Sequence, residues 1–169
     1  PIWTPLKFNW SHGHSSPELQ IAHGGDAGNL YWSPKPDNYK MIWTIRNEDF
    51  FMLNWGEPDF IRDHIRTNTH DFVGGYIIGS ETYIPAKEYS LKQDVPEWKY
   101  AFQKQWLFYA LWGRLLYNPD MADETFEAMI DQRYGLGDIA GNFLQALQLG
   151  SRYPLKLASF YKASWDFTL

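Results

Sequence analysis

Three short apolar segments that alternate with helical patterns constrain this fold more than any other feature of the sequence. Residues 5–10 and 73–78 have the composition of β-strands, and residues 50–54 form a continuous apolar run of strand length. Such a run is typical of a strand that is buried on both faces of a parallel sheet. The alternation of these strands with helices predicts βαβ units, so we expect an α/β protein with a parallel sheet.

Helical signals lie between and after these strands. Pro58 suits the first turn of a helix over residues 58–67. Its inward residues are expected to be Phe60, Ile61, His64 and Ile65, with His64 at the polar edge. Residues 38–47 are ambiguous, because Asp37 could cap a helix while Ile42-Trp43-Thr44-Ile45 favours a strand, and we expect a helix there.

The second half of the chain is predicted to be helical. Residues spaced by three or four indicate a helix over residues 97–117, and its aromatic stripe is expected in the core. The stripe consists of Trp98, Phe102, Trp106, Tyr109, Trp112 or Gly113, and Leu116. Pro119 and Asp120 introduce a helix near residues 123–134 that Gly135 ends. A last helix is expected near residues 138–149, ending at Gly150.

Composition excludes several classes of protein. The 169 residues include 15 Lys and Arg against 20 Asp and Glu, so the net charge is −5 and no basic cluster is present to bind nucleic acid. No apolar run approaches the ~20 residues of a membrane span. With no Cys, disulfides and sulfur-based zinc sites are absent. We expect no cofactor and no metal. His12 and His14 could contact zinc, but without a third ligand polar contacts to a substrate are favoured.

Polar residues follow each predicted strand, where the carboxyl ends of a parallel sheet collect catalytic groups. The three groups are Asn9, His12 and His14; Asn54, Trp55 and Glu57; and Ser80, Glu81 and Tyr83. Glu81 is placed like a general acid or base, the alternative being a carboxylate that caps a turn. Glu57 is a second candidate, although Gly-Glu-Pro is also an ordinary helix start. Residues 46–49 would lie at the amino end of the strand at 50–54, where residues usually serve stability.

Aromatic residues make up 18% of the chain, and some of them fall in predicted loops. Trp32, Trp55 and Tyr83 lie in loops or just after strands. An aromatic face there can stack on the apolar face of a sugar ring. These three residues are therefore candidate sugar platforms.

Two motifs resemble a family of sugar-cleaving enzymes. Residues 74–81 read Gly-Gly-Tyr-Ile-Ile-Gly-Ser-Glu, and residues 112–120 read Trp-Gly-Arg-Leu-Leu-Tyr-Asn-Pro-Asp. Together they are similar to the end of the catalytic barrel in α-glucuronidase-like glycoside hydrolases. Residues 46–58 resemble uncharacterised bacterial relatives more than the characterised enzymes. The resemblance implies a partial (β/α)8 TIM barrel, its last βα units, over residues 1–118. A C-terminal helical extension would then pack on it over residues 119–169.

The same resemblance implies a function. The intact protein would hydrolyse a plant or algal polysaccharide or a uronate-containing glycan by carboxylate acid/base catalysis, and a periplasmic or secreted location is favoured. Under this hypothesis the polar groups at the predicted strand exits make Glu81 and Glu57 candidate acid/base residues or ligands of sugar hydroxyls. The implied substrate contacts are Asn9, His12, His14, Asn54, Trp55, Tyr83 and Lys87, of which Lys87 could meet a uronate carboxylate.

The number of predicted strands bears on partners. Three strands are too few for a closed barrel, so we expect the chain to pair with copies of itself or with the remainder of a larger barrel. The carboxylic general acid of the family lies on an earlier strand that has no counterpart here. The alternative function is a non-catalytic carbohydrate-binding or assembly module built on a barrel remnant.

Overall fold

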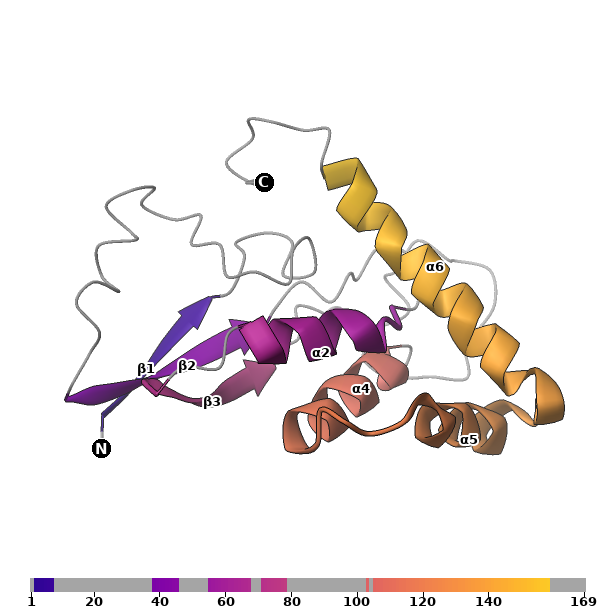
Figure 1. The fold of residues 1–169 in the computed structure, drawn as a ribbon, viewed down its shortest axis with the longest axis horizontal. Coiled ribbons are helices and arrows are strands. Elements are labelled where there is room, and N and C mark those ends of the chain that lie inside the picture. The colour runs from indigo at the N-terminus through magenta and orange to yellow at the C-terminus, as the bar shows by residue number, and fades with distance from the viewer. Residues whose placement is uncertain are drawn as a thin grey trace.

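The computed structural model describes residues 2–7, 38–45, 55–67, 71–78, 103 and 105–158. Helix predominates in these residues, and one parallel sheet lies at one end (Figure 1). The sheet consists of β1 (Ile2–Lys7), β2 (Tyr39–Ile45) and β3 (Val73–Ile78), in the order β1-β2-β3. Barrel segments and parts of open α/β sheets both have this sequential parallel order.

The segment that we expected to be a helix at residues 38–47 is strand β2, so that prediction was wrong. Met41, Trp43 and Ile45 are buried at alternate positions, with 3%, 0% and 0% of their surfaces exposed. This period of two belongs to a strand, and β-branched residues favour it over the helix that Asp37 could have capped. β2 pairs with β1 from Ile2↔Tyr39 onward, and an irregularity between Met41 and Ile42 shifts its register with β3.

The other two predicted strands have different outcomes. The strand at 73–78 is confirmed as β3. The strand expected at 5–10 begins earlier, at Ile2, and its described part ends at Lys7. The strand expected at 50–54 lies outside the described residues.

Helix α2 (Pro58–Thr67) connects β2 to β3 and confirms the helix predicted there. Because β2 and β3 are parallel, α2 runs opposite to them, and it begins on the side toward which the strands point (Figure 1). Phe60, Ile61 and His64 are buried as expected. His64 is not at a polar edge, because none of its surface is exposed and its ring lies edge-on to Tyr76 and Trp112.

The remaining helices lie on the same side of the sheet as the start of α2 (Figure 1). They are α4 (Trp106–Tyr117), α5 (Asp123–Tyr134), the short 3-10 helix η2 (Gly137–Ile139) and α6 (Ala140–Ala158). α5 ends at Gly135 as predicted, and the φ of 66° at this residue is a left-handed conformation that glycine adopts easily. α6 passes through Gly150 instead of ending there, because the following residues bond to the start of α2.

The buried face of α4 differs from the aromatic stripe expected in the sequence. Its buried residues are Leu107, Phe108, Leu111, Trp112 and Leu115, while Trp106, Tyr109 and Leu116 are only partly buried. α4 is apolar on nearly all sides, so periodicity alone cannot locate the face that packs inward. The part of the predicted helix at residues 97–102 lies outside the described residues.

The motif at residues 112–120 forms the end of α4 and the turn after it. Asn118 caps the helix with its backbone N–H bonded to the carbonyl of Arg114, and its side-chain oxygen accepts the backbone N–H of Asp120. Pro119 follows the cap, where proline commonly stops a helix. This motif therefore has a local structural role.

One hydrophobic core spans the boundary proposed at residue 118. It joins Ile45 from β2 and Trp112 from α4 to Phe126 and Ile130 from α5 and Leu144 from α6. The helices after residue 118 thus pack on the same core as the strands and α2.

Two glycines, Gly135 at the end of α5 and Gly113 inside α4, allow a matched test of substitution by alanine. Gly135→Ala should lower the free energy of unfolding by about 1 kcal/mol, because alanine is strained at a φ of 66°. Gly113→Ala should raise it by about 0.5–1 kcal/mol, because Gly113 is an exposed position inside α4 and a Cβ there meets nothing within 4 Å. Urea unfolding of both variants checks the opposite signs, and equal effects would contradict the assignment of the two sites.

Candidate functional site

Two of the predicted site residues, Trp55 and Glu57, belong to the described part of the chain. They come directly before α2, at the end of the connection that follows β2. The others lie outside it: Asn9, His12, His14, Asn54, Glu81, Tyr83 and Lys87. The candidate platform Trp32 and the neighbour Ser80 lie outside it as well.

The place of residues 46–49 relative to a strand changes with the assignment of β2. We expected Arg-Asn-Glu-Asp before a strand, at its amino end. Because β2 ends at Ile45, these residues directly follow the carboxyl end of a parallel strand in the chain. The reason for expecting these residues to serve stability therefore no longer holds, although they lie outside the described residues.

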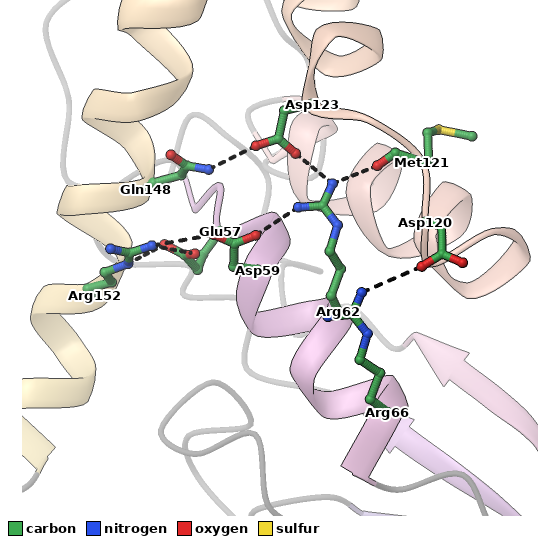
Figure 2. A network of polar contacts seen from close by, with 9 residues as sticks. All are labelled: Glu57, Asp59, Arg62, Arg66, Asp120, Met121, Asp123, Gln148 and Arg152. Carbon is green, nitrogen blue, oxygen red and sulfur yellow. Dashed lines mark hydrogen bonds and ion pairs between the residues drawn. The ribbon is translucent and has the colours of Figure 1, made fainter.

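Glu57 is buried and bound to an arginine from the far end of the chain. Only 3% of its surface is exposed. Arg152 on α6 donates from Nε to Glu57 Oε2 at 2.8 Å and from Nη2 to Oε1 at 3.1 Å, the two-point geometry shown in Figure 2. As the residue before Pro58, Glu57 also accepts the backbone N–H of Phe60, a bond typical of a helix N-cap.

The ionisation of Glu57 reflects two opposing influences. Burial raises its pKa above the ordinary value, and the hydrogen bond and charge of Arg152 lower it by less. The carboxylate in turn raises the pKa of Arg152. A buried carboxyl with a raised pKa is a candidate for proton transfer, but the side chain points at Arg152 and is almost closed to solvent.

Trp55 is a core residue in this structure and offers no open ring face to a sugar. It is 5% exposed, and its ring meets Phe60 and Phe108 edge-on at centroid distances of 5.9 and 5.6 Å. The cavity beside it has a volume of about 10 Å³, which is room for about one water molecule. Its lining is mostly aromatic and aliphatic: Trp55, Gln105, Trp106, Leu107, Tyr134, Phe143 and Leu147.

The backbone of the same segment is held by two side chains distant in sequence. The N–H of Trp55 donates to Gln105 Oε1 at 3.3 Å, and the N–H of Gly56 donates to Ser151 Oγ at 2.8 Å. A Cβ on Gly56 would lie 3.1 Å from Leu107 Cδ2 and 3.2 Å from Leu147 Cβ, so this glycine permits close packing. Residues 55–57 are therefore fixed by groups from beside α4 and from α6.

Arg62 joins α2 to the start of α5 in a neighbouring network (Figure 2). Its guanidinium donates to Asp59 at 2.8 Å, and to Asp123 and the carbonyl of Met121 at 2.6 Å each. Gln148 of α6 bonds to the other oxygen of Asp123 at 3.4 Å. This network ties three helices together, and its Asp59 also pairs with Arg152 Nη2 at 3.7 Å, so it meets the partner of Glu57 at that side chain.

Sequence reasoning missed the partners of this segment: Gln105, Ser151 and Arg152. None of them stands in a motif or in a periodic pattern that points to residues 55–57. The contacts of Gly56 and Glu57 cross 95 positions of the chain, so only the folded structure brings these residues together.

Neither a metal centre nor a membrane span emerges from the described residues. No three His, Asp or Glu side chains among them are grouped so that they could hold a metal ion. Within the same ranges, no helix has the length and apolarity needed to cross a bilayer. Comparison of the chain with protein families, with curated proteins and with solved structures finds no match.

The raised pKa of Glu57 predicts how stability changes with pH. Folding favours the protonated carboxyl, so the contribution of Glu57 is complete below its ordinary pKa of about 4.5 and is lost as pH rises through the folded value. The difference is the unfolding free energy of the native protein minus that of Glu57→Gln, and this signed difference should therefore be more positive at pH 4.5 than at pH 7.5. Urea unfolding at both values measures it, and a difference that grows with pH would contradict the pKa direction.

Proposed function

We propose that this chain is part of the catalytic domain of a glycoside hydrolase. The substrate class is a plant or algal polysaccharide or a uronate-containing glycan, and the bond is cleaved by carboxylate acid/base catalysis. The observation that carries the proposal is the position of Glu81, three residues after the end of β3, within the motif that resembles the family. The carboxyl ends of parallel strands are where catalytic groups collect in α/β enzymes.

Glu81 is the proposed general acid or base, and the other residues predicted after the strand ends are proposed to contact the sugar. Glu57 is better suited to hold the site together than to react, because it is almost closed to solvent and bonded at two points to Arg152. Trp55 likewise supports the site from the core. A (β/α)8 barrel remains the proposed architecture of the whole catalytic domain, with the rest of its strands as the proposed partner.

A second function is favoured by the surface of the sheet. Ile2, Trp3 and Ile77 are 68%, 47% and 45% exposed, which is unusual for a parallel sheet because its two faces are normally covered. An assembly or carbohydrate-binding module would use such a surface to meet a partner or a glycan. In that case the chain binds without cleaving any bond.

One experiment separates the two functions. The purified protein is incubated with glucuronoxylan, pectin, alginate and agarose, and reducing ends are measured over time, while binding to the same polymers is followed by affinity electrophoresis. Release of reducing ends supports the hydrolase. Retention on a polymer without release supports the binding module, and the absence of both would contradict both sugar functions.

A further inference from the structure

The end of the connection between β2 and α2 is held by three side chains that are distant in the sequence. Three successive residues are bonded: Trp55 through its N–H to Gln105, Gly56 through its N–H to Ser151, and Glu57 through its carboxylate to Arg152. All three are buried. Two of the three bonding partners are adjacent residues of α6, so this helix fixes both position and direction of the segment.

The surroundings leave this segment little freedom to shift. Gly56 is packed so closely that even a methyl group would lie 3.1 Å from Leu107 and 3.2 Å from Leu147. The two parallel bonds between Arg152 and Glu57 also fix the plane of the carboxylate. Ser151 and Arg152 therefore take part directly in holding the segment in this position.

This segment belongs to the part of a βα unit that usually carries function. In parallel α/β enzymes, the connections that follow the carboxyl ends of the strands carry the catalytic and binding groups. The connection after β2 is attached to the sheet at Ile45 and to the helices at residues 55–57.

We infer that Ser151 and Arg152 of α6 are positioning residues for the proposed active site, acting by fixing the end of the connection that follows β2. The inference rests on the proposed function. It means that α6 helps to position the catalytic groups, although its bonding residues lie 95 positions further along the chain than the residues they hold. Neither residue is expected to touch the substrate.

The test compares variants that remove the contacts of α6 with residues 56 and 57 with a variant that removes contacts between α2 and α5. Ser151→Ala and Arg152→Met remove the contacts to residues 56 and 57, and Ser151→Thr keeps a hydroxyl. Arg62→Met is the matched control, because Arg62 links α2 to α5 through Asp59, Met121 and Asp123 and contacts none of residues 55–57. It leaves in place Asp59, which also pairs with Arg152 at 3.7 Å. For each protein, kcat and KM are measured on whichever of the four polymers is hydrolysed fastest, together with the midpoint of urea unfolding.

Ser151→Ala and Arg152→Met should each lower kcat roughly 10-fold with little change in KM, since a misplacement of about 1 Å can reduce a rate about 100-fold. Ser151→Thr should recover most of the rate. Arg62→Met should lower the urea midpoint at least as much as Ser151→Ala and Arg152→Met do. It should leave the kcat of the folded protein unchanged. Equal kcat values for the Ser151, Arg152 and Arg62 variants would overturn the inference while leaving the hydrolase proposal intact. A native protein that cleaves none of the polymers would instead refute the hydrolase proposal.

Discussion

Replacing Trp112 with alanine should lower the free energy of unfolding by about 3–5 kcal/mol, the range for removing a fully buried aromatic side chain. Trp112 has no exposed surface, and its ring lies 5.5 Å from that of His64, 6.4 Å from Tyr76 and 6.4 Å from Phe108. It thus joins α4 to α2 and to β3. Since domains of this size have a total stability of about 5–15 kcal/mol, the variant should lose a large fraction of its stability.

Thermal unfolding by circular dichroism measures this effect as a fall in Tm of about 6–20 °C. Tyr117→Ala is the matched control on the same helix, because Tyr117 is 90% exposed and its removal should change stability by no more than about 0.5 kcal/mol. A loss below about 1 kcal/mol for Trp112→Ala would mean that this indole is not central to the core. Such a result would also mean that the contacts of Trp112 with α2 and β3 contribute little to stability.

The sequence predicted helices and turns better than it predicted strands. Pro58 and Gly135 act through their own backbone restrictions, so the start of α2 and the end of α5 could be placed from local chemistry. Strand β2 could not be assigned from local chemistry, because residues 39–45 satisfy a helical pattern and a strand pattern at once. Pairing with β1 and β3 decides between them, and pairing partners 32 or more positions away are not visible in a local window.

The same limit applies to the extent of α6 and to the candidate site. Gly150 is a reasonable stop in isolation, since glycine costs about 1 kcal/mol in a helix relative to alanine. The bonds of Ser151 and Arg152 to Gly56 and Glu57 favour continuing the helix, and they depend on the tertiary fold. Glu57 could be recognised from its sequence as a helix-start carboxylate, but its burial and its arginine partner could not.

Glu81→Gln should reduce turnover by about 100-fold to 10,000-fold, the range for removing a general acid or base. Glutamine preserves the size of the side chain and removes only its capacity to exchange a proton, so binding and folding should persist. The measurement is kcat for release of reducing ends, with the urea midpoint as a check on folding. Glu124→Gln supplies the same chemical change at an exposed position in the first turn of α5 and should leave turnover unchanged.

Glu57→Gln distinguishes a reacting carboxylate from a supporting one. Glycoside hydrolases use two carboxyl groups about 5–5.5 Å or about 6.5–9.5 Å apart, and both must reach the sugar. Glu57 is 3% exposed and its two oxygens are bonded to Arg152, so it reaches no sugar in this structure. Its amide variant should therefore lose about 10-fold or less, by displacement of the segment before α2, far below the loss for Glu81→Gln. Equal losses in the two variants would instead make Glu57 the second reacting carboxylate, and that would require α6 to move away from it during the reaction.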